Sequence, residues 1–277
     1  MKSNSDLAGV ALASADCERL HRSQVHVWYA FLSEGDAQLD ADQYALLAPS
    51  ERAQHSRFFF EKDRHRYLVT RALVRTILSR YADVRPKEWA FEAGQYGRPV
   101  ISNPDPYARR LSFNVSHCDD LVVLAIAIDR EIGIDTESTR RDAPLDLAYH
   151  YFSPREIAAL RALPFGSRAL RFWELWTFKE SYIKARAMGL SLPLDKISFL
   201  LEQEGSVSAT FDPGIEADDD RWQFWQFRPD EDHLVAICVE RVADQAVRFS
   251  NWQAHPPHAA QSLQVRTTRI PYQAVAS

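Results

Sequence analysis

The chain is poor in glycine, in cysteine and in long apolar runs, and each shortage excludes a class of protein. Its nine glycines form no Gly-rich phosphate loop of the Walker type. Its three cysteines, Cys17, Cys118 and Cys238, show no paired spacing, which excludes a disulfide scaffold and fits a reducing cytoplasm. Leu7–Ala15 is too short for a membrane span and lacks the basic start of a signal peptide. We therefore expect a cytoplasmic protein with no membrane association.

Positive charge is also in short supply, because 33 basic residues face 38 acidic ones and the formal net charge is −5. This balance excludes a nucleic-acid binder that relies on overall charge. One N-terminal region is an exception, since arginines gather at positions 57, 64, 66, 71, 75 and 80. A solvated helix face is the ordinary explanation of such a run, although arginine forks also suit phosphate. We expect a helix from about Glu61 to Tyr81, with Arg75 and Arg80 on the surface.

A short acidic motif follows a run of apolar residues in the middle of the chain. Leu121–Ile128 reads as a buried strand, and the charged turn Asp129–Glu131 leads into a second strand that begins at Ile132. Alternation along that strand places Asp135 and Glu137 on the same face. Two neighbouring carboxylates suit Mg²⁺, although such pairs alone are more often solvated.

A second motif lies about forty residues later, in a segment without proline or glycine. The spacing of its apolar residues predicts a helix over Ala169–Ala187. Gly189, just beyond it, is the expected stop residue. Glu180 and Lys184 are four residues apart and therefore share one face, where a surface pair would contribute a few tenths of a kcal/mol. The bulk of the aromatic residues on this helix instead predicts that the face borders a partly buried cleft: Trp173, Trp176 and Tyr182.

Together these motifs have a family resemblance. Gly133–Glu137 reads Gly-Ile-Asp-Thr-Glu and Trp176–Lys184 reads Trp-Thr-Phe-Lys-Glu-Ser-Tyr-Ile-Lys, and the pair resembles the 4'-phosphopantetheinyl transferases of the larger, surfactin-synthetase-activating type. Three upstream segments resemble the same family in the same order: Asp63–Arg75, Tyr96–Pro99 and Phe113–His117. The resemblance runs from about Ser50 to about Ile237, and several ordered motifs are more specific than any one alone.

The resemblance implies an α/β (α+β) fold of two similar halves related by a pseudo-twofold axis, each a small sheet packed with a long helix. We place the junction near Asp129–Ile132, so that residues 1–130 provide coenzyme A contacts and residues 131–277 provide the metal-binding and catalytic motifs. We expect the C-terminal half to contain further elements near Pro154–Leu163, Ile197–Leu201 and Leu234–Val239. The tail from Ala254 is either flexible or packed across the halves. A monomer is expected, because one chain already supplies both halves.

The implied reaction moves 4'-phosphopantetheine from coenzyme A to a serine of an acyl or peptidyl carrier protein and releases adenosine 3',5'-bisphosphate. The resemblance assigns Mg²⁺, with Mn²⁺ as the alternative, to Asp135, Glu137 and Glu180. Lys184 would offset charge on the phosphate oxygens. The general base is either Glu180 or Glu137, and the sequence does not separate ligand from base.

Coenzyme A itself is assigned to five residues by the same resemblance: Arg66, Arg98, Ser116, His117 and Lys184. Arg66 would meet the 3'-phosphate and His117 another phosphate. The chain departs from the family nearby, because Glu51 and Gln54 stand where relatives have lysines. Two other functions remain open: a non-catalytic module that binds coenzyme A or a carrier protein, and a different metal-dependent phosphotransferase or hydrolase. The carrier protein served is not legible from the motifs.

Overall fold

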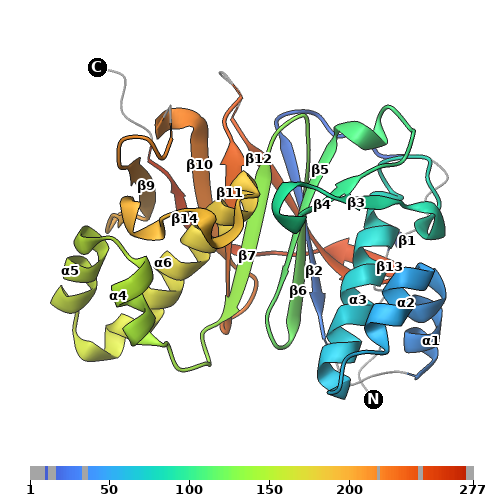
Figure 1. The fold of residues 1–277 in the computed structure, drawn as a ribbon, viewed down its shortest axis with the longest axis horizontal. Helices are drawn as coiled ribbons and strands as arrows, with labels where there is room; N and C mark the ends of the chain where they lie inside the picture. Colours follow the sequence, from blue (N-terminus) through green and yellow to red (C-terminus); the bar gives the residue numbers. More distant parts are fainter. Residues whose placement is uncertain (1–9, 12–16, 33–36, 217–218, 243–245, 273–277) are drawn as a thin grey trace, which may run out of the picture.

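A computed structural model describes residues 10–11, 17–32, 37–216, 219–242 and 246–272. In this part of the chain the strands form two six-stranded sheets and one two-stranded sheet. The two large sheets stand side by side, and each carries a long helix on its outer side (Figure 1). The predicted α/β fold is confirmed, while the pseudo-twofold relation of the halves stays a prediction.

The N-terminal sheet has the strand order β1-β13-β12-β2-β6-β5. Its pairs are antiparallel, except that β12 runs parallel to β2. The strands are β1 (Val10–Ala11), β13 (Ala259–Ser262), β12 (Arg248–His255), β2 (Gln24–Phe31), β6 (Leu121–Ile128) and β5 (Leu111–His117). The prediction of a buried strand over Leu121–Ile128 is confirmed to the residue. A small hairpin of β3 (Phe91–Ala93) and β4 (Pro99–Ile101) lies beside this sheet.

Helix α3 (Glu61–Leu78) covers the outer face of the N-terminal sheet, with α1 (Ala37–Leu46) and α2 (Pro49–His55) beside it. Leu73 and Ile77 on α3 are fully buried in one cluster with Trp28 and Leu124 of the sheet. The helix begins at the predicted residue and ends three residues before Tyr81, which is buried just beyond it.

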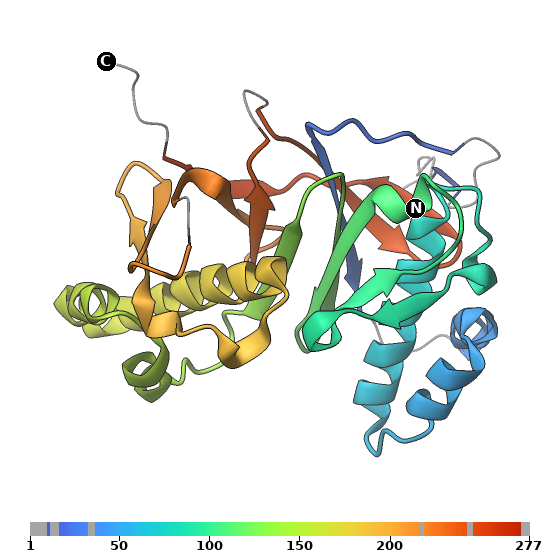
Figure 2. The same ribbon diagram turned by 45° about the horizontal axis from the view of Figure 1, so that its top comes forward.

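The C-terminal sheet has the strand order β7-β11-β10-β14-β9-β8. Its strands are β7 (Ile132–Ser138), β11 (His233–Glu240), β10 (Trp222–Arg228), β14 (Arg266–Pro271), β9 (Ser206–Phe211) and β8 (Ile197–Leu201). Helix α6 (Phe165–Arg186) packs across it, with α4 (Ala148–Tyr151) and α5 (Pro154–Ala162) at one end. Figure 2 shows α6 lying along this sheet. The predicted end of α6 at Gly189 was wrong, because Ala187 already adopts a left-handed conformation with φ 50° and stops the helix there.

The inner faces of the two sheets share a third apolar core. Alternate residues of β6 point in opposite directions: Leu124 joins the cluster with α3, whereas Val123 joins a cluster with Ile134 and Ile237 of the other sheet. Because β6 is covered on both faces, it is apolar throughout rather than alternating. The layers therefore follow the order α3, N-terminal sheet, C-terminal sheet, α6.

Residues 254–272 of the C-terminal tail pack across the halves, so over this described part the packed alternative holds rather than the flexible one. Strand β12 pairs with β2, and β13 then pairs with β12, so residues 248–262 complete the N-terminal sheet. The chain returns to the C-terminal sheet with β14. A division after residue 130 therefore leaves two strands of the N-terminal sheet in the second segment.

Candidate active site

The site forms where strand β7 and helix α6 approach each other unusually closely. A Cβ atom added to Gly133 would lie 2.0 Å from the carbonyl oxygen of Ser181 and 2.4 Å from the backbone nitrogen of Ala185. Only glycine allows this contact between strand and helix. The contact brings Asp135, two residues further along β7, next to Lys184 of α6.

Lys184 is bound to two side chains in the space between the halves. Its Nζ atom lies 2.7 Å from Asp135 Oδ1 and 2.7 Å from Ser116 Oγ, and the Ser116 hydroxyl donates to the same carboxylate oxygen at 2.9 Å. Asp135 is 5 % exposed. The ammonium group therefore joins β5, β7 and α6 instead of forming the surface pair with Glu180 that its helical spacing favours.

Three carboxyl groups in this region, those of Asp135, Glu137 and Glu180, are only partly compensated by Lys184 and Arg141. Burial first, and then the charge of Asp135, raises the pKa of Glu137 to about 7 and that of Glu180 to about 7. Asp135 Oδ2 is buried and has no hydrogen-bond partner among the described residues. An unsatisfied carboxylate oxygen beside two carboxyl groups that resist ionisation is a donor set that suits a divalent cation.

The three predicted metal ligands are close enough to influence one another's ionisation, but they do not form a tight cluster. Over the described residues, the one group of three or more His, Cys, Asp or Glu side chains with ligand atoms within 4.8 Å is Cys118, Asp120 and His233. Joint metal binding by Asp135, Glu137 and Glu180 therefore stays a prediction. No motif in the sequence singled out the other cluster.

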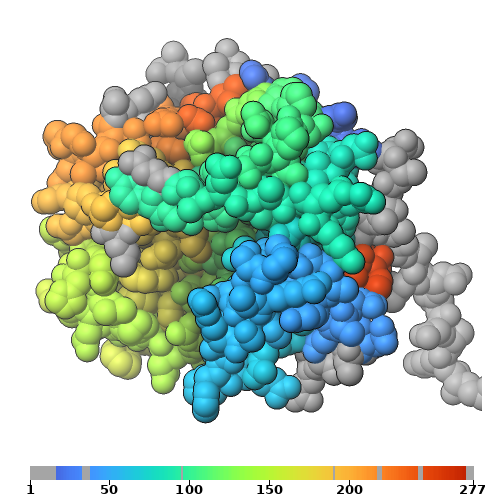
Figure 3. All heavy atoms as spheres, turned by 45° about the vertical axis from the view of Figure 1, so that its right-hand side comes forward, coloured from blue at the N-terminus to red at the C-terminus, as the bar shows by residue number. Residues whose placement is uncertain are grey.

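A cleft of about 380 Å³ connects Asp135, Glu137 and Lys184 with helix α3. Figure 3 shows the surface on which the N-terminal helices meet the C-terminal half. Six of the predicted site residues line the cleft: Arg66, Ser116, His117, Asp135, Glu137 and Lys184. A neighbouring cavity of about 220 Å³ shares Lys184 and is lined by Tyr96–Pro99. Glu180 lines neither cavity, but its charge is coupled to those of Asp135, Lys184 and Glu137.

The α3 side of the cleft is cationic. Arg66 donates to Asp63 at 2.6 Å and lies 3.7 Å from Asp119. Desolvation in the cleft, followed by the positive charges of Arg66 and Lys184, lowers the pKa of His117 below its ordinary value. This shift favours the neutral imidazole of His117, which can donate one hydrogen bond from a ring nitrogen.

Arg71, which the sequence motifs did not single out, also lines the cleft. Its guanidinium lies 5.1 Å from the centre of the Tyr67 ring, and its Nε atom is buried with no hydrogen-bond partner in the part of the chain that is described. The sequence could have identified Arg71 as a cleft residue, because Tyr67 and Arg71 are four residues apart and so share a helix face.

Arg98 is placed differently from the prediction that it meets a phosphate. Its guanidinium donates to Glu131 at 3.0 Å, to the carbonyl oxygens of Lys184 and Ala185 at 3.3 Å each, and to that of Phe113 at 3.2 Å. These contacts cap the last turn of α6, where a cation is favourable, and fix α6 to β5. Arg98 lines the 220 Å³ cavity, but both terminal nitrogens of its guanidinium already have protein acceptors.

The departure at Glu51 has a structural reason. Its carboxylate accepts a 2.8 Å hydrogen bond from Arg75, whose side chain is 3 % exposed and also donates to the carbonyl oxygens of Pro86 and Trp89. Glu51 is thus the partner of a buried cation.

The assignment of Arg75 and Arg80 to the surface was wrong. The side chain of Arg75 is 3 % exposed, and that of Arg80 is 11 % exposed and lies over the Trp28 ring.

Comparison with known proteins agrees with this geometry. The profile of the 4'-phosphopantetheinyl transferase superfamily matches residues 131–238, and a profile described as 4'-phosphopantetheinyl transferase, N-terminal, matches residues 37–129. The chain belongs to the 4'-phosphopantetheinyl transferase superfamily, which confirms the predicted family and enzyme class.

Individual relatives place the chain more narrowly within the family. It is 33 % identical over 218 residues to 4'-phosphopantetheinyl transferase HetI of a Nostoc species. The aligned residues cover 78 % of this chain and 87 % of HetI. It is 36 % identical over 165 residues to 4'-phosphopantetheinyl transferase Sfp of Bacillus subtilis, covering 59 % of this chain and 70 % of Sfp. Among solved structures, holo-[acyl-carrier-protein] synthase of Thermotoga maritima superposes with a TM-score of 0.33 at 19 % identity, covering 44 % of this chain and 66 % of that protein.

Proposed function

We propose that the chain transfers the 4'-phosphopantetheine group from coenzyme A to a serine of an acyl or peptidyl carrier protein and releases adenosine 3',5'-bisphosphate. The family and the names of the relatives support this reaction. The observation that carries the proposal is the position of Lys184, bound to Asp135 and Ser116 in the cleft between the halves.

The cleft has the charge distribution that a bound pyrophosphate requires. Arg66, Arg71 and Lys184 line it together with the neutral imidazole of His117, and they supply donors for phosphate oxygens. The carboxylates of Asp135 and Glu137 line it too and would repel a polyanion unless a cation lay between. Coenzyme A, bound with its phosphates over the arginines, fits this arrangement.

Mg²⁺ is the cation of this proposal, with Mn²⁺ as the alternative. The unsatisfied Oδ2 atom of Asp135 and the raised pKa values of Glu137 and Glu180 fit a hard divalent ion, so Asp135 would hold it together with whichever of Glu137 and Glu180 does not act as the base. When bound, it would neutralise charge that develops on the pyrophosphate during transfer.

The remaining steps belong to the chain's own side chains. Lys184 offsets negative charge on the oxygens of the departing nucleotide, and His117 and Arg66 hold the phosphates in place. Glu180 is the base that takes the proton of the acceptor serine. Its carboxylate has no hydrogen bond to a described residue and its pKa of about 7 suits a base at neutral pH, whereas Glu137 is paired with Arg141 at 3.3 Å. Glu137 remains the alternative base.

Intact-protein mass spectrometry tests the proposal. Several apo carrier proteins are incubated with the chain, coenzyme A and Mg²⁺, with and without a chelator. A gain of one phosphopantetheine that the chelator abolishes is the expected result, and it ranks the carrier proteins at the same time. If no carrier gains mass while coenzyme A still binds by calorimetry, the chain is a binding module and the proposed reaction is wrong.

The proposal extends to a cytoplasmic monomer. All three cysteines are free, which suits a reducing compartment. None of the helices in the described ranges has the length and apolar character of a membrane span. The inner faces of the two sheets already bury each other within one chain, so light scattering should give the mass of one chain.

A further inference from the structure

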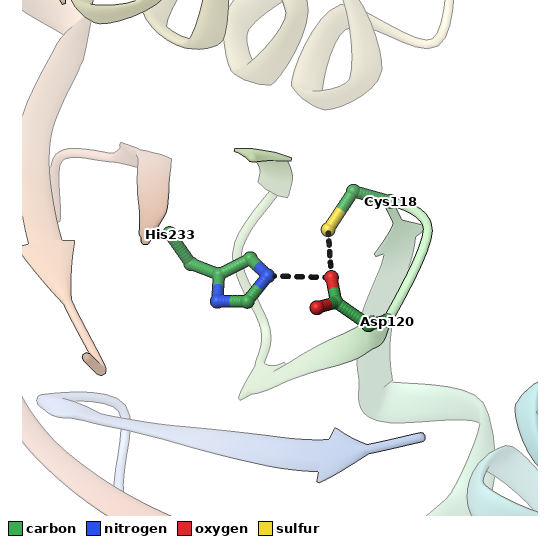
Figure 4. Close-up of side chains that lie close together, drawn as sticks. All are labelled: Cys118, Asp120 and His233. Carbon is green, nitrogen blue, oxygen red and sulfur yellow. Dashed lines mark hydrogen bonds and ion pairs between the residues drawn. The ribbon is translucent and has the colours of Figure 1, made fainter. Parts of the chain in front are cut away.

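Outside the proposed active site, three side chains of different chemistry converge from both halves of the molecule. Cys118 and Asp120 lie in the turn between β5 and β6, and His233 begins β11 (Figure 4). Asp120 Oδ1 lies 2.8 Å from His233 Nε2 and 4.0 Å from Cys118 Sγ. Cys118 is 5 % exposed and His233 is 3 % exposed, whereas the side chain of Asp120 is 35 % exposed.

The other nitrogen of His233 is held by a second carboxylate. His233 Nδ1 lies 2.8 Å from Asp230 Oδ2, and Asp230 Oδ1 accepts backbone hydrogen bonds from Asp232 at 2.8 Å and His233 at 2.9 Å. Arg140 pairs with the remaining oxygen of Asp120. A carboxylate on the far nitrogen of a histidine is the usual support of a metal-binding imidazole, because it fixes the ring and raises its basicity.

From this geometry we propose that Cys118, Asp120 and His233 form a zinc site with three protein ligands. Thiolate, imidazole and carboxylate are the ligands that Zn²⁺ takes, whereas Mg²⁺ avoids sulfur. Zinc bonds of about 2.0–2.3 Å in a tetrahedron place ligand atoms roughly 3–4 Å apart. Cys118 Sγ lies at this spacing from Asp120 Oδ1, the 2.8 Å between Asp120 Oδ1 and His233 Nε2 would have to widen slightly on binding, and the ligand atoms of the three residues all lie within 4.8 Å of one another. The partly exposed side of Asp120 leaves a fourth position for water.

The site has a different role from the carboxylates that serve the proposed reaction. The turn with Cys118 and Asp120 directly follows Ser116 and His117, which line the cleft. His233 lies on the C-terminal sheet, beside Ser138 at the end of β7. Bound zinc would therefore fix this turn to the opposite half and hold Ser116 and His117 in position, without contacting the substrate.

Without metal, a protonated His233 between Asp120 and Asp230 would satisfy the same polar groups as an ion pair. Zinc would have to displace protons from the imidazole and from the thiol. The two arrangements differ in whether the sulfur is bonded to a metal, and that bond has its own spectroscopic signature.

Cobalt substitution in the full chain provides the test, because Co²⁺ bound to a thiolate gives a near-ultraviolet charge-transfer band that carboxylate sites lack. The protein is stripped with a chelator, kept reduced and titrated with Co²⁺ in excess Mg²⁺. One equivalent of Co²⁺ should produce the band, and Zn²⁺ should remove it. Cys118→Ala should abolish the band, whereas the matched variants Cys17→Ala and Asp119→Asn should retain it.

A variant outside the ligand set keeps the test decisive if Cys118→Ala does not fold. Asp230→Asn leaves all three ligands in place but weakens the support of His233, and it should reduce Co²⁺ affinity by about 10-fold to 100-fold. Absence of the band in the unaltered protein, its survival in Cys118→Ala, or unchanged affinity in Asp230→Asn would overturn the zinc site. Each of these readouts is independent of transferase activity.

Discussion

Lys184 Nζ and Ser116 Oγ lie 2.7 Å apart, although 68 residues separate them in the sequence. Ser116 belongs to the N-terminal sheet and Lys184 to the helix of the C-terminal half. Neither half alone can assemble the cluster that they form with Asp135. The active site is therefore a property of the interface between the two sheets.

Replacement of Lys184 by methionine should reduce phosphopantetheine transfer by at least about 100-fold, because a preorganised charge at the phosphate oxygens is lost. The methionine preserves most of the apolar stem but leaves the buried Asp135 carboxylate without its cation, so stability should fall by a few kcal/mol and the rates are compared at a temperature at which both proteins are folded. The rate is measured by mass spectrometry on the carrier protein that serves best. Lys196→Met is the matched control, since that lysine is half exposed and 3.7 Å from Asp212, and it should transfer at the normal rate. Normal transfer by Lys184→Met would remove this residue from the mechanism.

The metal-free protein should lose stability as the pH rises. Burial raises the pKa of Glu137 and of Glu180 from 4.5 to about 7, so the folded state binds these protons more tightly than the unfolded state. Their contribution is fully present below pH 4.5 and is lost as the pH rises through about 7. A rise in pKa from 4.5 to about 7 corresponds to roughly 3 kcal/mol for each carboxyl group, so the free energy of unfolding should fall by roughly 3–7 kcal/mol in total over this window.

Urea unfolding with a chelator at pH 5 and pH 8 measures this change, and Mg²⁺ should restore stability at the higher pH, where the carboxylates are free to bind it. Glu180→Gln cannot ionise and should show a smaller pH dependence, whereas Glu231→Gln, an exposed residue of another loop, should behave like the unaltered protein. A stability that rises between these two pH values would contradict the burial of the two carboxyl groups.

Substitution of Gly133 by alanine should destabilise the fold by more than about 3 kcal/mol, because the added Cβ meets the backbone of α6 and no side chain can move aside. The control is Gly166→Ala near the start of the same helix, where nothing lies within 4 Å of the new atom. That change should be neutral or stabilise by up to about 1 kcal/mol. Thermal and urea unfolding compare the two variants, and equal stability would mean that β7 and α6 are not in such close contact.

Arg75→Met should cost about 3–5 kcal/mol of stability, since it leaves the Glu51 carboxylate without its cation in a mostly buried position. Arg57 belongs to the same arginine-rich region but is exposed, and Arg57→Met should change stability by less than about 0.5 kcal/mol. Urea unfolding separates the two outcomes. A negligible effect at Arg75 would show that its ion pair is dispensable.

Local patterns predicted the elements that bear the site. The uninterrupted apolar run identified β6, and helical spacing identified the shared face of Glu180 and Lys184. The period of two along β7 placed Asp135 and Glu137 correctly relative to each other. These signals were legible because each arises from residues a few positions apart.

Contacts between distant segments were not legible in the same way. The arginines at positions 75 and 98 look alike in sequence, and only the fold shows that one is buried against Glu51 and the other caps α6. The convergence of Cys118, Asp120 and His233 depends on how the two sheets are aligned, because Asp120 and His233 are 113 positions apart in the sequence. Burial and long-range register are properties of the packed chain, which a single sequence read by local periodicity does not reveal.

The return of β12 and β13 to the first sheet gives the chain an order of assembly. During synthesis, the strands β2, β5 and β6 emerge long before residues 248–262, the segment that pairs with β2 on its open side. Until then β2 presents an unpaired edge, which is a site for wrong partners. The late strands close that edge only after α6 and the motif residues have been made, so the N-terminal sheet waits for most of the C-terminal half, and β14 then completes the C-terminal sheet.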